Sequence, residues 1–115
     1  MKYLGLDTSS KAIHIVELDE DVNLINIYKA ECSTKEAFKD RFPELMDDFA
    51  RILVEEINID TVDYAVIEEP IFGQNRNVVR TLSEVVGAVW ATLCLSDIPT
   101  KLVDNGTWKK QILGS

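Results

Sequence analysis

Two carboxylates close two short apolar runs, and they are the residues of this chain best suited to chemistry. Asp7 follows the run Lys2–Leu6, and Glu68 ends the run that begins at Asp63. If the two runs are neighbouring strands, their carboxylates lie roughly 5 Å apart, the spacing between strands of a sheet. Two carboxylates that close repel each other unless a cation lies between them. Oxygen ligands suit Mg²⁺ or Mn²⁺, so the pair predicts a metal site for phosphoryl transfer.

Glu69 directly follows Glu68, and consecutive side chains of a strand face opposite sides. Only one of these two glutamates can therefore face Asp7, while the other faces solvent or a helix. Either acidic residue alone could be an ordinary polar strand end that hydrogen-bonds the next turn. The two together, on strands expected to be adjacent, favour the metal site.

Polar residues follow both carboxylates and could bind a phosphate. Thr8 and Ser9 form a tight turn after Asp7, and their hydroxyls could contact a phosphate oxygen or could simply make the turn hydrophilic. Helix N-termini favour anions and arginine binds phosphate. An anion site or an ordinary polar helix start would explain the residues near the start of the second long helix equally well, namely Gln74, Asn75, Arg76 and Arg80.

The remaining candidates are three lysines and one histidine. Lys109 and Lys110 follow Trp108 and could bind nucleic acid, but a packed tryptophan with two solvated lysines is the commoner arrangement. His14 lies in the middle of a predicted strand, and we expect it to be structural rather than catalytic. Lys101 lies in the last predicted strand and is a candidate for contacting a DNA backbone.

The hydrophobic pattern predicts the elements that position these residues. Three strands in a meander are followed by a helix, a strand, a long helix, a strand and a short helix. Ser33 and Glu36 have capping-box spacing, and Pro43 predicts that the first helix either begins near it or is kinked there. The predicted ranges of the strands are Lys2–Leu6, Ala12–Leu18, Leu24–Ala30, Asp63–Glu68 and Thr100–Val103, and the long helix ends near Ser96.

Composition limits the class of protein. The 115 residues suffice for a single α/β domain covering residues 1–115. The net charge of −8 argues at first against nucleic acid, but residues 1–70 hold seven basic and seventeen acidic residues, whereas residues 71–115 hold five and three. We find no membrane span or signal peptide in the sequence. Cys32 and Cys94 lack metal-type spacing, which predicts reduced thiols in a cytoplasmic protein.

The order and spacing of several segments resemble RuvC-type Holliday junction resolvases, and phage-like members in particular. The similar segments cover nearly the whole chain: Gly5–Ser10 (GLDTSS), Val66–Phe72 (VIEEPIF), Arg80 and Gly87 in the long helix, and Val103–Gly114 (VDNGTWKKQILG). The resemblance implies an RNase H-like fold, a five-stranded mixed sheet flanked by helices, with three antiparallel strands followed by two parallel ones. It also implies a homodimer that cuts four-way DNA junctions with Mg²⁺, for which Mn²⁺ can substitute.

The resemblance assigns roles to individual residues. Asp7 matches the catalytic aspartate of the first strand, and Glu68 matches the catalytic glutamate of the fourth, both of them metal ligands. Ile71, with Phe72 beside it, matches the aromatic wedge that opens the junction. The family has two further acidic residues, or Asp with His, on a final helix, whereas this sequence stops at Ser115. We therefore expect a truncated form, a site completed by another chain, or impaired catalysis.

Two other functions stay open. A sugar-kinase or actin-like ATPase opens with a similar hairpin, but the sequence lacks its second phosphate loop and its glycine-rich adenosine loop. The chain could also bind branched DNA, or serve a structural role, without cutting DNA.

Overall fold

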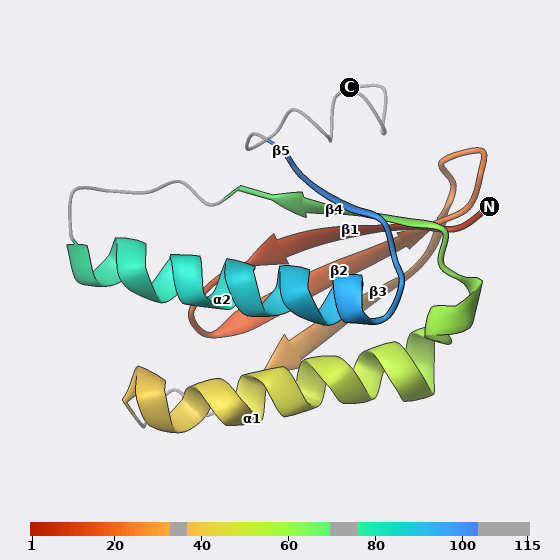
Figure 1. Ribbon diagram of the computed structural model, residues 1–115. Coiled ribbons are helices and arrows are strands. Elements are labelled where there is room, and N and C mark those ends of the chain that lie inside the picture. The colour runs from red at the N-terminus through yellow and green to blue at the C-terminus, as the bar shows by residue number, and fades with distance from the viewer. Residues whose placement is uncertain (33–36, 70–75, 104–115) are drawn as a thin grey trace.

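Five strands form one mixed sheet in the computed structural model, which describes residues 1–32, 37–69 and 76–103. The spatial order is β3-β2-β1-β4-β5. The first three strands pair antiparallel, and β4 and β5 pair parallel on the other side of β1 (Figure 1). This arrangement confirms the predicted topology. The strands are β1 (Tyr3–Thr8), β2 (Ala12–Leu18), β3 (Leu24–Glu31), β4 (Tyr64–Glu68) and β5 (Thr100–Val103).

Two long helices cover one face of this sheet (Figure 1). Helix α1 (Phe38–Arg51) runs into a π-helical segment (Ile52–Ile57), and a short 3-10 helix (Ile59–Thr61) leads into β4. Helix α2 (Arg76–Leu95) joins β4 to β5. The predicted capping box at Ser33 and the predicted last helix after Asn105 lie outside the described residues.

Pro43 does not mark the start of the first helix. Helix α1 begins five residues earlier, at Phe38, and Pro43 lies inside it. A proline in this position removes the backbone hydrogen bond that its N–H would donate to the carbonyl of Lys39. Burial outweighs that loss, because Leu45 and Phe49 on the next two turns are fully buried against the sheet.

The core lies between the sheet and the two helices. Alternate residues of the central strands face it, among them Leu4 and Leu6 of β1 and Ala65 and Ile67 of β4. The helices contribute Leu45, Phe49, Val85, Val89 and Leu93. By length and composition alone, α2 would also be able to cross a membrane. Since one side of it packs into this core, we interpret α2 as a core helix.

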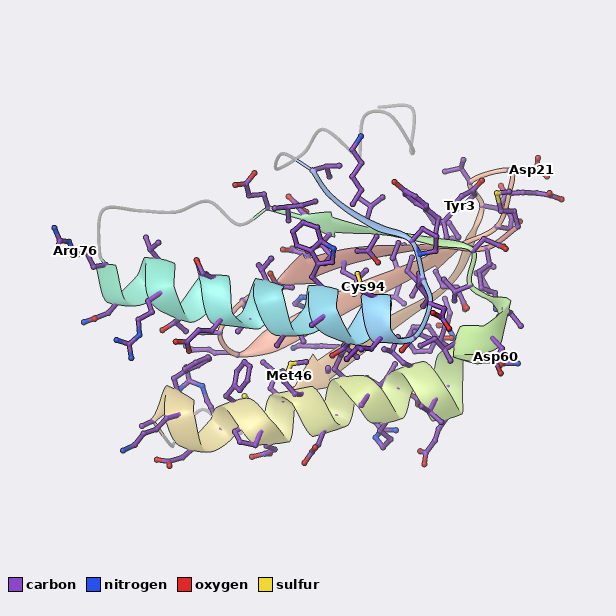
Figure 2. The ribbon with its side chains drawn as sticks, viewed as in Figure 1. Tyr3, Asp21, Met46, Asp60, Arg76 and Cys94 are labelled. Atoms are coloured by element: carbon purple, nitrogen blue, oxygen red, sulfur yellow. The ribbon has the colours of Figure 1, made fainter. Side chains whose placement is uncertain are left out.

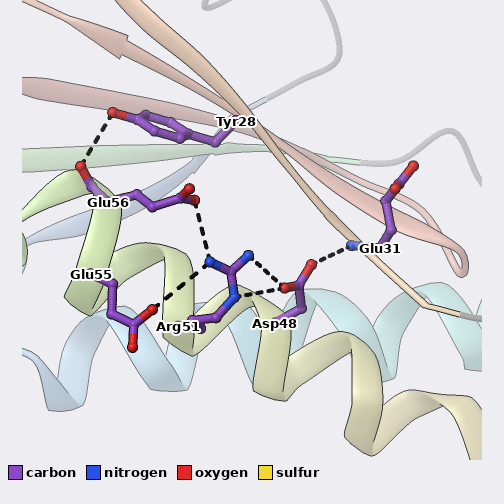
Figure 3. A network of polar contacts seen from close by, with 6 residues as sticks. All are labelled: Tyr28, Glu31, Asp48, Arg51, Glu55 and Glu56. Atoms are coloured by element: carbon purple, nitrogen blue, oxygen red, sulfur yellow. Dashed lines mark hydrogen bonds and ion pairs between the residues drawn. The ribbon is translucent and has the colours of Figure 1, made fainter.

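Buried or partly buried polar groups tie α1 and the strands together. Glu17 is buried on the helix-covered face, where Lys2 Nζ lies 3.1 Å from its Oε2 and the Tyr28 hydroxyl donates to its Oε1 over 3.1 Å. Figure 3 shows the neighbouring network, in which the Asp48 carboxylate accepts hydrogen bonds from the Glu31 backbone N–H and from Arg51. These hydrogen bonds lower the pKa of Asp48 below its usual value, the backbone one most strongly.

Candidate functional site

Asp7 and Glu68 lie directly opposite each other on adjacent strands. Strands β1 and β4 are parallel, and their register pairs Asp7 with Glu68. The strand ends therefore meet at the same edge of the sheet, and Figure 1 shows both arrowheads pointing toward the end at which α2 begins. Neighbouring strands are about 4.8 Å apart, so the two carboxylates belong to one site. The predicted adjacency of the two strands is confirmed.

Both carboxylates face away from the helices. Leu6 and Thr8, on either side of Asp7 in the chain, belong to the helix-covered face, as does Ile67 before Glu68. Side chains alternate along a strand, so Asp7 and Glu68 share the opposite face. Glu69 then points to the helix side. Of the two consecutive glutamates, Glu68 is the partner of Asp7.

The two carboxylates differ in exposure. Asp7 is exposed, whereas Glu68 is only 4% exposed. Electrostatic interactions are stronger in a buried environment, so a cation held here interacts most strongly with Glu68. An exposed Asp7 stays accessible to an incoming ligand. This asymmetry suits a site at which one ligand is fixed and the other meets solvent or substrate.

The oxygen donors suit a single hard cation. Mg²⁺ usually keeps several water ligands and is bound by one or two carboxylates together with substrate phosphates. Asp7 and Glu68 supply such a pair. Within residues 1–32, 37–69 and 76–103, no group of three or more His, Cys, Asp or Glu side chains is arranged to hold a metal ion. The described residues therefore fit one cation, with open positions left for water or phosphate.

Thr8 ends β1, and Ser9 begins the β1–β2 turn. Ser9 Oγ donates to the Ala12 carbonyl over 3.1 Å and accepts from the backbone N–H groups of Lys11 and Ala12. Thr8 is 5% exposed on the helix-covered face, and its hydroxyl has no hydrogen-bond partner within the described part of the chain. The Thr8 hydroxyl therefore lies on the opposite face of the strand from the carboxylates.

The predicted basic residues lie on two sides of the molecule. Arg76 begins α2 and points away from the sheet in Figure 2. Arg80, one turn later, has an 81% exposed side chain and forms an ion pair with Glu84. It also lines a cavity of about 470 Å³ between α1 and α2. Lys101 is exposed on β5 and shares the face of Asp7 and Glu68, because it pairs with Val66.

Several predicted DNA contacts lie outside the described residues, namely Ile71, Phe72, Gln74, Asn75, Lys109 and Lys110. Among the other acidic residues, Asp97 lies in the turn before β5, with φ 60°. Because β5 runs parallel to β4, the start of β5 lies at the opposite edge of the sheet from Glu68. Asp97 is therefore remote from the carboxylate pair.

One residue that sequence reasoning assigned to structure lies in this site. His14 is exposed on β2, and the antiparallel register pairs it with Asp7. Directly opposed residues of an antiparallel pair share one face. The sequence could have placed His14 opposite Asp7 if the first strand had been predicted to extend to Thr8. The pairing across the β1–β2 turn would then have followed by counting residues outward from the turn.

Solved structures share this fold. RuvC of T. thermophilus in complex with a Holliday junction substrate matches with a TM-score of 0.74 and 16% identity, over 96% of this chain and 68% of that one. The Thermus thermophilus RuvC structure matches with a TM-score of 0.71 and 17% identity, over 99% and 70%. A putative N-acetylmannosamine kinase from Listeria monocytogenes matches with a TM-score of 0.54 and 14% identity, over 99% of this chain and 40% of that one.

These similarities show the fold alone, given their low identity. The fold is the RNase H-like α/β fold found in RuvC. No protein-family model and no curated protein sequence matches the chain.

Proposed function

We propose that this protein is a divalent-metal-dependent nuclease that cleaves phosphodiesters of branched DNA and resolves four-way junctions. One observation carries the proposal: two carboxylates lie opposite each other at the same end of β1 and β4, in a fold shared with RuvC bound to a Holliday junction. The putative kinase matches with a lower TM-score of 0.54, and this chain covers 40% of its length. A nuclease therefore fits better than a kinase.

Asp7 and Glu68 are the residues that would hold the cation. A bound Mg²⁺ or Mn²⁺ supplies charge that polarises a phosphate and lowers the pKa of a water molecule. The chain's own contribution is to fix the ligands. Glu68 is buried on β4, and the exposed Asp7 lies beside it on β1. This preorganisation lowers the cost of ordering the site when substrate binds.

Basic residues would supply the DNA contacts. Lys101 lies on the same face as the carboxylates, and Arg76 and Arg80 lie on α2, which begins at the same end of the sheet. Contacts of this kind go to phosphates, so affinity should fall as salt rises. A junction can be recognised through its shape without base-specific contacts. Ile71 and Phe72 as a wedge, and the homodimer, rest on resemblance to the family.

A second candidate is a protein that binds branched DNA without cutting it. In the described part of the chain, Asp7 and Glu68 have no further acidic residue beside them that completes a metal-binding group. Two-metal hydrolysis uses a pair of ions about 3.5–4 Å apart and needs more ligands than these two. A binding protein with a single weakly held cation would show junction binding and no hydrolysis.

The consecutive glutamates provide a matched test of the nuclease. Glu68→Gln removes a carboxylate from the site, whereas Glu69→Gln makes the same change one residue away on the helix side. We expect Mn²⁺-dependent cleavage of a four-way junction to be lost in the first variant and retained in the second. Equal cleavage by both variants would rule out this site as the catalytic centre. Binding without cleavage by the unmodified protein would favour the second candidate.

A further inference from the structure

The carboxylate pair belongs to a single row of side chains that crosses the whole sheet. The register pairs Lys29 with His14, His14 with Asp7, Asp7 with Glu68, and Glu68 with Val103. One residue from every strand therefore stands in this row, on the face turned away from α1 and α2. The row changes character along its length, because a cation and an imidazole lie on one side of the carboxylates and an apolar residue lies on the other.

We propose that His14 and Lys29 form a phosphate-binding extension of the carboxylate site. In this arrangement a DNA strand crosses β1, β2 and β3. The phosphate to be cut lies at Asp7 and Glu68, and the adjoining backbone lies over His14 and Lys29. This inference rests on the proposed function. It adds a direction for the substrate backbone across the sheet, away from Val103 and toward β3.

The spacing of the row suits this partner. Strands are about 4.8 Å apart, so His14 stands about 5 Å from Asp7 along the row and Lys29 about 10 Å. The flexible side chain of Lys29 can extend over part of the distance between β3 and Asp7. Both residues are exposed, so a backbone passing over β2 and β3 can reach them.

The chemistry of both side chains suits a phosphate oxygen. An imidazole donates at least one N–H whether it is neutral or charged, so His14 can bind phosphate in either form. Its charged neighbours in the row are Asp7 on β1 and Lys29 on β3. Lys29 Nζ lies 2.7 Å from Glu31 Oε1, with both side chains about half exposed. Exposed ion pairs contribute little stability, so the ammonium can exchange Glu31 for a phosphate at small cost.

Binding in the absence of divalent cations tests the row apart from catalysis. Lys29→Gln removes one phosphate contact, and Lys39→Gln makes the same change on an exposed residue of α1, on the helix side. We expect Lys29→Gln to weaken four-way junction binding about threefold to tenfold. It should also lower the slope of log affinity against log salt by about 1. Lys39→Gln should leave both quantities unchanged.

His14 is the single histidine of the chain, so its imidazole proton signals in an NMR spectrum are unambiguous. We expect a short single-stranded oligonucleotide to shift these signals in the absence of metal. Mn²⁺ should broaden them in the unmodified protein, because the paramagnetic ion would be held beside Asp7. Asp7→Asn should abolish the broadening. A His14→Asn variant, which keeps an N–H donor, should bind the junction better than His14→Ala.

The outcomes separate the two proposals. If the protein cuts junctions while Lys29→Gln and His14→Ala bind as well as the unmodified protein, the phosphate-binding role of the row is contradicted and the nuclease activity is supported. If both variants lose binding but the protein never cuts, the row is supported and the nuclease fails. If the protein binds no branched DNA at all, both proposals are overturned. An unshifted histidine signal at saturating oligonucleotide also contradicts the row.

Discussion

Replacing Asp7 by asparagine should stabilise the fold when no divalent cation is present. The register pairs Asp7 with Glu68 on neighbouring strands, and we take the strand spacing of about 4.8 Å as the scale of the separation between their charges. Coulomb's law at that distance gives about 1 kcal/mol of repulsion in water and about 3.5 kcal/mol at an effective dielectric constant of 20. Because Asp7 is exposed, we expect a gain near the lower figure, about 1 kcal/mol.

Thermal unfolding with a chelator measures this effect. A gain of about 1 kcal/mol in a domain of this size should raise the melting temperature by about 4 °C. Asp60→Asn, at an exposed position of the 3-10 helix, makes the same change away from the site and serves as the control. Mn²⁺ at tenfold its dissociation constant should then stabilise the unmodified protein by about 1.4 kcal/mol, which cancels the advantage of the variant. A variant that is less stable than the unmodified protein in chelator would refute the reasoning.

Three further changes test the fold around the site. Asp48→Asn should cost about 1–2 kcal/mol of stability at pH 7. Because the pKa of Asp48 is lowered in the folded protein, its contribution to stability is present above pH 4 and is lost in stronger acid. The denaturant midpoints of the two proteins should therefore converge in strong acid. Tyr28→Phe should cost about 1 kcal/mol at pH 7 by removing the hydrogen bond to Glu17. Burial raises the pKa of Tyr28, so the unmodified protein should lose stability as the pH rises above 10, and a difference from the variant that stays constant from pH 8 to 11 would contradict this. Phe49→Ala should cost about 3–5 kcal/mol in urea unfolding, since this side chain is fully buried, and a cost below 1 kcal/mol would place Phe49 outside the core.

The strands were predictable because each is a short apolar run with a clear end. Ala12–Leu18 and Thr100–Val103 match their predicted bounds, and short connections imply the antiparallel meander. We predicted that β1 and β4 are adjacent because Asp7 and Glu68 close their apolar runs and could form one metal site together. The carboxylate pair was therefore predictable from the sequence.

Other features depend on register and packing, which no local pattern specifies. His14 and Lys29 enter the row only because the β1–β2 turn and the β2–β3 connection set their partners, and a shift by one residue would turn each to the other face. Thr8 is polar in the sequence but stands on the buried face. Pro43 is a helix breaker by propensity, yet packing of the following turns keeps α1 continuous. The π-helical segment at Ile52–Ile57 had no signal in the sequence.

The most direct test of the proposed nuclease is cleavage of a labelled four-way junction with Mg²⁺ or Mn²⁺, beside a linear duplex of the same sequence. The unmodified protein and Asp7→Asn would be compared at equal occupancy of the DNA. We predict metal-dependent cutting that prefers the junction and is lost in the variant. Binding without any cutting, or cutting that survives in Asp7→Asn, would contradict the assignment of Asp7 and Glu68 as a catalytic metal site.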